Sequence, residues 1–237
     1  MPDPGPAALL FDVFGTCVDW RASVAREVGA AAARAGVALD PLAFADAWRA
    51  LYQPSMEAVR SGRRPFVPLD VLHRESLEAL LPRFGLAGRL PEAALDDLNR
   101  AWHRLDPWPD VVPGLARLRR RFVVAPHSNG NVALIVAMAR RAGLAWDCVL
   151  GAEVVGRYKP ERESYRIAAR LLALAPGEAM MVAAHAGDLR AARDAGLRTA
   201  FVARPHERGP GAGAEAPPVG CDVVARDFLE LADRLGA

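Results

Sequence analysis

Three charged residues of this sequence have side chains suited to covalent chemistry: Asp12, Lys159 and Asp188. A carboxylate can attack carbon or phosphorus, and a nearby ammonium group holds such a carboxylate in its charged form. Lys159 is the one lysine among 30 basic residues, and all the others are arginine. A lysine ammonium is a compact point charge, unlike the planar guanidinium of arginine, so the presence of one lysine in an arginine-rich chain makes Lys159 a candidate functional residue. The alternative is that this lysine has been retained by chance.

Short apolar runs that predict buried strands lie before these residues. The runs span residues 7–11, 122–125, 148–150, 180–184 and 199–202. Helical patterns lie between them at residues 132–142, 162–172 and 189–195, the last of which ends before Gly196. Strands that alternate with helices predict right-handed βαβ units around a parallel sheet. We therefore expect an α/β fold with a doubly wound, Rossmann-like core.

The carboxyl ends of the predicted strands carry polar residues. In chain order these are Asp12, Ser128 with Asn129, Lys159 and Asp188. Sheets of this type bind ligands beyond the carboxyl ends of their strands, where loops and helix N-termini offer free N–H groups. Ser128 and such N–H groups can hold an anionic substrate. The sequence thus predicts a catalytic site at this edge of the sheet.

Residues 17–105 have a different pattern, because apolar residues such as Val24, Val28 and Ala31 recur at helical spacing with almost no strand-like run. We expect several helices that form a cap inserted after the first strand. The connector 102–109 is rich in tryptophan and proline and is a predicted hinge. The predicted domains are a core of residues 1–16 and 106–237 and a helical cap of residues 17–105.

Composition excludes several classes of function. The chain has 237 residues, 52% of them hydrophobic, and a net charge of +2, so it can bury a large core but lacks the basic surface that nucleic acid or an anionic membrane would need. Its three cysteines are widely spaced and predict neither disulfides nor a zinc site. The N-terminal stretch has no basic segment before a long apolar run, which favours a cytoplasmic location.

Four sequence motifs, taken together, resemble those of the haloacid dehalogenase superfamily. They are DVFGT at 12–16, SNG at 128–130, YKP at 158–160 and GDLRAARDAG at 187–196. Their order matches the superfamily, and the cap falls where that superfamily inserts one. The resemblance covers the whole predicted core.

Two positions separate the branches of this superfamily. The phosphatases use a second aspartate two residues after the nucleophile as an acid, and Phe14 stands there. They also use two aspartates of the fourth motif around Mg²⁺, and Ala184 takes the place of the first while Asp188 matches the second. The site lacks a proton donor and an oxygen ligand, so we expect no metal and no organic cofactor.

The chain is therefore most similar to the L-2-haloacid dehalogenases. The resemblance implies that Asp12 is the nucleophile, that Thr16 and Lys159 position it, and that Asp188 activates the hydrolytic water. It implies that Arg49, in the pair Trp48-Arg49, and Asn129 bind halide. Backbone groups of Val13 and Phe14, with Ser128, would hold the substrate carboxylate, and Tyr165 falls at the tyrosine spacing of that family.

The sequence departs from the family at Ala183 and His185, where the family has serine and asparagine. We expect His185 to hydrogen-bond Asp188 or the attacking water. Simpler alternatives are that Asp188 is only a helix N-cap and that Arg49 lies on a solvated helix face.

The predicted activity is hydrolysis of small (S)-2-haloalkanoic acids to (R)-2-hydroxyalkanoic acids through a covalent aspartyl ester. The alternatives are a Mg²⁺-dependent phosphatase of the same superfamily and a non-catalytic relative that binds a small carboxylate. The expected partner is the small 2-haloacid, with neither nucleic acid nor membrane. The oligomeric state stays open, with a homodimer as the frequent assembly among relatives.

Overall fold

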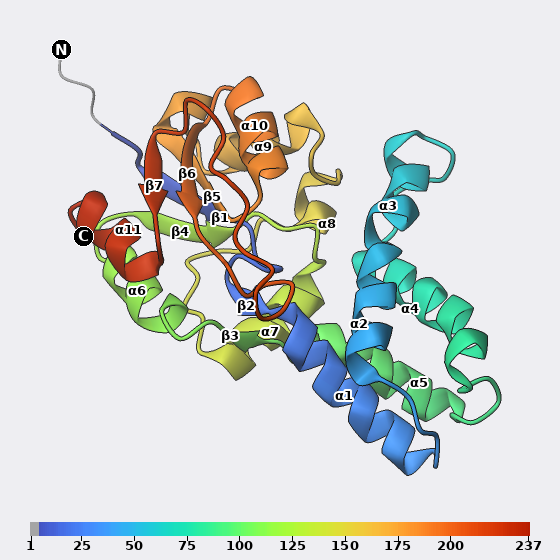
Figure 1. Cartoon of the computed structure of the whole chain (residues 1–237). Helices are drawn as coiled ribbons and strands as arrows, with labels where there is room; N and C mark the ends of the chain where they lie inside the picture. Colours follow the sequence, from blue (N-terminus) through green and yellow to red (C-terminus); the bar gives the residue numbers. More distant parts are fainter. Residues whose placement is uncertain (1–4) are drawn as a thin grey trace.

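The computed structural model describes residues 5–237, so residues 1–4, with which the predicted core domain and the N-terminal stretch begin, lie outside the described residues. A five-stranded parallel sheet in the order β4-β1-β5-β6-β7 forms its centre (Figure 1). The strands are β1 (Ala8–Phe11), β4 (Val123–Pro126), β5 (Ala179–Ala183), β6 (Arg198–Val202) and β7 (Val223–Ala225). The predicted α/β fold with a parallel sheet is confirmed.

Helices cover both faces of this sheet, as a doubly wound fold requires. They are α6 (Val111–Leu118), α7 (Val132–Ala142), α8 (Ala152–Val155), α9 (Arg162–Leu171), α10 (Ala186–Asp194) and α11 (Phe228–Arg234), with a short 3₁₀ turn, η3 (Pro176–Glu178). Side chains alternate across β1: Leu9 and Phe11 join one buried cluster, which includes α11, and Leu10 joins another, which includes α9 and α10. The fully buried strands explain why their sequences are continuous apolar runs.

One predicted strand is wrong. Residues 148–150 form an irregular segment beside β4. Only two spaced backbone bonds join this region to β4, from Asp147 N to Val124 O at 2.9 Å and from Leu150 N to Pro126 O at 3.1 Å. This is too little pairing for a strand, so β4 forms one edge of the sheet. A short apolar run specifies burial without specifying strand pairing.

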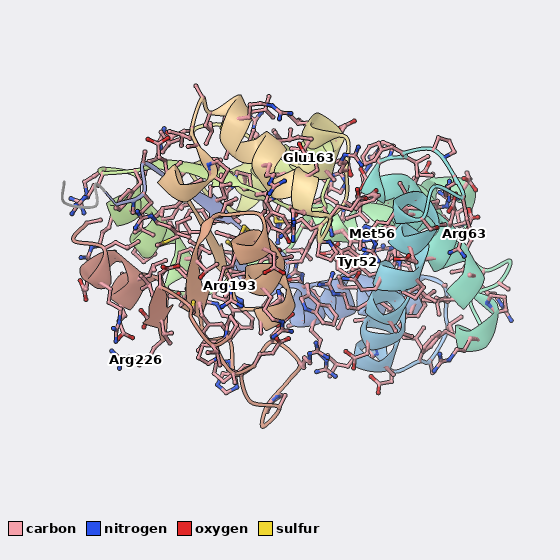
Figure 2. The ribbon with its side chains drawn as sticks, turned by 90° about the horizontal axis from the view of Figure 1, so that it is seen from above. Tyr52, Met56, Arg63, Glu163, Arg193 and Arg226 are labelled. Atoms are coloured by element: carbon pink, nitrogen blue, oxygen red, sulfur yellow. The ribbon has the colours of Figure 1, made fainter. Side chains whose placement is uncertain are left out.

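The remaining helices lie to one side of the sheet and form the cap (Figure 1). They are α1 (Trp20–Arg34), α2 (Pro41–Ala50), α3 (Tyr52–Arg60), α4 (Leu69–Leu80) and α5 (Glu92–Asn99), with 3₁₀ turns η1 (Pro82–Phe84) and η2 (Arg100–His103). Two short antiparallel strands, β2 (Val18–Asp19) and β3 (Asp106–Pro107), pair where the chain enters and leaves the cap. Seen from above, Tyr52 lies on the side of the cap toward the sheet and Arg63 lies farther out (Figure 2).

A polar contact also joins the cap to the sheet. Asn131, which precedes α7, donates from Nδ2 to Asp70 Oδ2 of α4 at 2.9 Å, and Asp70 N donates to Asn131 Oδ1 at 3.3 Å. His103 Nε2 lies 2.9 Å from the same Asp70 carboxylate.

Among residues 5–237, no helix is both long enough and apolar enough to cross a membrane.

Candidate active site

Asp12 lies directly after β1, with its side chain almost fully buried at the carboxyl edge of the sheet. Thr16 donates from Oγ1 to Asp12 Oδ2 at 2.7 Å, and Lys159 donates from Nζ to Asp12 Oδ1 at 3.0 Å. Burial alone would raise the pKa of Asp12. The charge of Lys159 and the hydrogen bond from His185 outweigh burial and hold this pKa well below its usual range. Asp12 is therefore a carboxylate at neutral pH.

Lys159 joins the two carboxylates of the site. Its Nζ also donates to Asp188 Oδ2 at 2.5 Å. Its backbone N donates to Asn129 Oδ1 at 2.7 Å, which fixes the turn after the irregular segment against the loop that follows β4. Burial would lower the pKa of Lys159, but the charges of Asp12 and Asp188 outweigh that cost and raise it. The ammonium group thus stays charged inside the protein.

Asp188 lies in the first turn of α10. The N-cap of this helix is His185, so the interpretation of Asp188 as a simple N-cap does not hold. Besides Lys159, Asp188 accepts a short hydrogen bond from the hydroxyl of Tyr165 on α9. Burial is the largest influence and raises the pKa of Asp188. The structure places Tyr165 behind Asp188 rather than in the cavity described below.

The His185 side chain does not hydrogen-bond the Asp188 carboxylate, which was one of the two partners expected for it, although Asp188 N donates to His185 O at 3.1 Å within the helix start. Its Nδ1 lies 3.0 Å from Asp12 Oδ2, and its Nε2 lies 3.0 Å from Oε2 of Glu207. Glu207 also accepts a hydrogen bond of 3.0 Å from Trp20 Nε1. Sequence reasoning missed Glu207, which lies in the irregular segment after β6 and belongs to none of the motifs.

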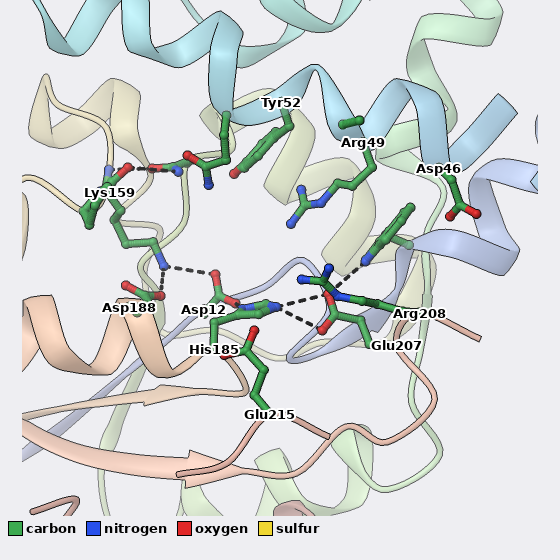
Figure 3. Close-up of a pocket in the computed structure, with 16 residues that line it drawn as sticks. Asp12, Asp46, Arg49, Tyr52, Lys159, His185, Asp188, Glu207, Arg208 and Glu215 are labelled. Atoms are coloured by element: carbon green, nitrogen blue, oxygen red, sulfur yellow. Dashed lines mark hydrogen bonds and ion pairs between the residues drawn. The ribbon is translucent and has the colours of Figure 1, made fainter. Parts of the chain in front are cut away.

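A cavity of about 780 Å³ opens above Asp12 between the sheet and the cap (Figure 3). It is lined by Asp12, Trp20, Asp46, Arg49, Ala50, Tyr52, Gln53, Asn129, Lys159, Pro160, His185, Gly187, Asp188, Glu207, Arg208 and Glu215. Arg49 points into this cavity from α2. Its Nη1 is buried and has no hydrogen-bond partner among the described residues. Arg49 therefore does not lie on a solvated helix face, and an anion would satisfy it.

The loop after β1 offers free backbone donors. The N–H groups of Val13 and Phe14 make no hydrogen bond with another described residue. Ser128 is buried, and its Oγ accepts a hydrogen bond of 3.1 Å from Gly130 N. The Phe14 ring packs into the aromatic core of the cap, with its centroid 5.9 Å from that of Trp102. An apolar ring thus occupies the position at which the phosphatase branch needs an acid.

We tested whether this site fits a divalent cation. Within residues 5–237, no three His, Cys, Asp or Glu side chains are grouped so that they could hold a metal ion. Ala184 supplies no side-chain oxygen, and its backbone N donates to Thr16 Oγ1 at 2.9 Å. Lys159 places a positive charge between Asp12 and Asp188. These residues do not fit the oxygen shell that Mg²⁺ requires.

The fold and the site define a hydrolase with an aspartate at the end of its first strand and an inserted cap. A family model, haloacid dehalogenase-like hydrolase, matches residues 6–196, so the chain belongs to this family.

Individual similar proteins have more specific names than the family model. The chain is 33% identical over 132 residues to the (S)-2-haloacid dehalogenase of Xanthobacter autotrophicus, a match that covers 54% of this chain and 51% of that protein. The crystal structure of a defluorinating L-2-haloacid dehalogenase superimposes with a TM-score of 0.94 and 47% identity, over 98% of this chain and 96% of the other. An L-2-haloacid dehalogenase structure from X. autotrophicus with chloropropionic acid covalently bound has a TM-score of 0.78 and 25% identity, over 98% and 99% of the two chains.

Proposed function

We propose that this protein hydrolyses small (S)-2-haloalkanoic acids to (R)-2-hydroxyalkanoic acids through an ester on Asp12. The observation that carries the proposal is the placement of Asp12 and Arg49 on opposite sides of one cavity. An ionised nucleophile then faces a guanidinium whose buried Nη1 has no hydrogen-bond partner among the described residues. This arrangement suits displacement of an anionic leaving group at a carbon held between the two residues. The activities named for the relatives support the same reaction.

In the first step, Asp12 attacks C2 of the substrate. Its Oδ2 accepts hydrogen bonds from Thr16 and His185, whereas Oδ1 accepts one, from Lys159. Oδ1 therefore has more lone-pair density available and is the proposed nucleophilic atom. As the Oδ1–C2 bond forms, the C2–halogen bond breaks, and the halide leaves with the electron pair toward Arg49 and Asn129. The N–H groups of Val13 and Phe14, with Ser128, hold the substrate carboxylate.

In the second step, water attacks the carboxyl carbon of the Asp12 ester. Asp188 takes a proton from this water, in accord with its raised pKa. Negative charge then develops on Asp12 Oδ2, to which Thr16 and protonated His185 already donate. Collapse of this intermediate breaks the bond between the carboxyl carbon and Oδ1, and the product alkoxide takes up a proton. Asp12 is regenerated with one oxygen from water.

The domain division is part of the proposal. We assign residues 1–16 and 106–237 to the catalytic core and residues 17–105 to a cap that supplies Arg49. The β2–β3 pair would form the hinge, because both connections between these parts pass through it. Cytoplasmic location remains a prediction from the sequence, and the oligomeric state stays open, with a homodimer as the assembly frequent among relatives.

A halide-release screen tests the proposed function. The protein is incubated with both enantiomers of 2-chloropropionate, with chloroacetate, bromoacetate and fluoroacetate, and with phosphate monoesters, each with and without EDTA. We expect halide release from the (S) enantiomer that EDTA does not change, and none from Asp12→Asn. Metal-dependent phosphate release would favour the phosphatase alternative. Thermal stabilisation by haloacids without any turnover would favour the non-catalytic binding protein.

A further inference from the structure

Tyr52, the first residue of α3, is a cavity residue that the reaction described above does not use. Its side chain is 6% exposed, and its hydroxyl points into the cavity on the side opposite Asp12 (Figure 3). The other two tyrosines have fixed partners. Tyr158 donates to Val67 O at 2.7 Å, and Tyr165 donates to Asp188. The Tyr52 oxygen instead has the side-chain amide of Asn129 as its hydrogen-bond partner, and this contact lowers the pKa of the phenol, as a donor to the oxygen does. The O–H proton of Tyr52 is left free to point to an acceptor in the cavity.

Tyr52 also packs directly against Arg49. The guanidinium carbon of Arg49 lies 4.1 Å from the centroid of the Tyr52 ring. Stacking of this kind orients the guanidinium plane and excludes water from one of its faces. The guanidinium of Arg49 and the hydroxyl of Tyr52 are thus two donors on the cap that point into the cavity, and the buried Nη1 of Arg49 has no hydrogen-bond partner among the described residues.

The protonation state of Tyr52 suits a donor. Burial raises the pKa of the phenol, and the charge of Arg49 only partly opposes this shift. The hydroxyl therefore keeps its proton at neutral pH. Its ring edge contacts Phe14, with the centroids 6.1 Å apart, so the ring has a defined position above the loop that carries the nucleophile. A phenol with a fixed ring, whose oxygen is held by the Asn129 amide, has its O–H proton preorganised for an acceptor in the cavity.

We propose that the Tyr52 hydroxyl donates a hydrogen bond to the departing halide and so contributes to leaving-group specificity. This inference rests on the proposed dehalogenase function. As the C2–halogen bond breaks, the halogen takes the bonding electron pair, and the O–H group of Tyr52 stabilises the growing negative charge together with Arg49. The proton stays on Tyr52, because a halide ion is a very weak base. No further reactant is needed.

The proposal makes the contribution of Tyr52 depend on the halogen. Chloride accepts hydrogen bonds more strongly than bromide, and bromide more strongly than iodide, because the charge of the smaller ion is more concentrated. Loss of a hydrogen bond to a charged group costs on the order of tenfold or more in rate, and we assign about tenfold to chloride. We expect the loss to be about twofold for iodide, with bromide between them.

The test is single-turnover halide release by Tyr52→Phe with (S)-2-chloro-, bromo- and iodopropionate. A single turnover isolates the displacement from ester hydrolysis. Tyr52→Phe keeps the ring that stacks on Arg49 and removes only the hydroxyl. The matched control is Tyr158→Phe, which removes a buried hydroxyl that joins cap and sheet outside the cavity. We expect a graded loss, largest for chloride, in Tyr52→Phe and a loss independent of the halogen in Tyr158→Phe.

An equal loss for all three halogens in Tyr52→Phe would show a purely structural role and overturn the inference, as would no loss at all. Both results would leave the proposed function intact, since the parent protein would still release halide. If the parent released no halide from any haloacid, the proposed function and this inference would fall together. Chloride inhibition gives a second readout: the inference predicts that Tyr52→Phe weakens it about tenfold.

Discussion

His185 and Asp12 share a hydrogen bond of 3.0 Å between Nδ1 and Oδ2. Because Glu207 binds the other ring nitrogen, the imidazole bridges two carboxylates. Burial would lower the pKa of His185, but the hydrogen bonds that its ring donates to both carboxylates outweigh burial and raise the pKa to about 10. His185 is therefore an imidazolium that stabilises the ionised form of Asp12. It stands where the related family has asparagine, so this chain holds its nucleophile with an additional positive charge.

Glu207→Gln should move the pH dependence of the reaction. With one carboxylate removed, the pKa of His185 falls from about 10 toward its ordinary value of 6.5. We expect the alkaline limb of kcat/KM to move to lower pH in this variant. Glu215→Gln is the control, since Glu215 accepts only a backbone hydrogen bond, from Ala186 N. An alkaline limb that does not move in Glu207→Gln would contradict the assignment.

The same pair predicts how stability varies with pH. The pKa of His185 in the folded protein lies above its value in the unfolded chain. Its contribution to the free energy of unfolding is therefore fully present below about pH 6.5 and is lost as the pH rises through about 10. Urea unfolding measured at pH 6 and at pH 10 gives the free energy of unfolding at each pH. We expect this free energy to fall more from pH 6 to pH 10 in the parent than in Glu207→Gln. An equal fall in the free energy of unfolding in both proteins would contradict a contribution of the His185–Glu207 pair to the pH dependence of stability.

Gly15→Ala should disturb Glu207. Gly15 has a φ of +87°, and a Cβ atom there would overlap the Glu207 carboxylate. The matched control is Gly36→Ala, with a φ of +66° and no atom within 4 Å of the new Cβ. Left-handed backbone alone costs about 1–2 kcal/mol in each variant. We expect a larger fall in Tm for Gly15→Ala, with an alkaline limb shifted as in Glu207→Gln. Equal effects of the two variants would refute the contact.

Lys159→Met should slow displacement strongly. The two carboxylates that Lys159 separates would lose their shared counter-charge, and one of them would take up a proton. Without the ammonium group the pKa of Asp12 rises and its carboxylate is no longer oriented, so we expect a rate loss of at least about 100-fold in single-turnover halide release, which is about 2.7 kcal/mol of activation free energy. Lys159→Arg should not restore the rate, because a planar fork cannot replace a compact ammonium here. Full activity in Lys159→Arg would contradict this.

The sequence predicts most of the strands, because parallel strands that are buried on both faces are continuous apolar runs. It also predicts that the motifs meet, because the carboxyl ends of these strands lie along one edge of the sheet. That logic places Asp12, Asn129 and Asp188 around one cavity, although 148–150 is not a strand. The same logic does not identify Glu207. The segment between β6 and β7 has no hydrophobic periodicity, so the sequence does not predict that this segment returns to His185. The expected side-chain hydrogen bond from His185 to Asp188 is wrong for the same reason, because the sequence does not reveal Glu207 as a partner, and the contact of His185 with the attacking water stays a prediction.

Tyr52 shows a second limit of the sequence. It lies at the junction of α2 and α3, in the segment for which the sequence predicts only helices and no site residue other than Arg49. The junction instead directs Tyr52 toward the cavity beside Arg49. Periodicity identifies which residues are buried, whereas the angle between two helices decides whether a buried residue faces the core or a site. The sequence leaves open whether Arg49 lies on a solvated helix face, whereas in the structure it points into the cavity and its buried Nη1 has no hydrogen-bond partner among the described residues.

The most direct test of the covalent reaction is a single turnover of (S)-2-chloropropionate in H₂¹⁸O with enzyme in excess. Attack of water on the Asp12 carboxyl carbon places the solvent oxygen in Asp12, so we expect ¹⁸O in the peptide that contains Asp12 and unlabelled 2-hydroxypropionate. The label should reach the product only in later turnovers. Incorporation of ¹⁸O into the product in the first turnover, with Asp12 unlabelled, would mean that water attacks the substrate directly and would contradict the account.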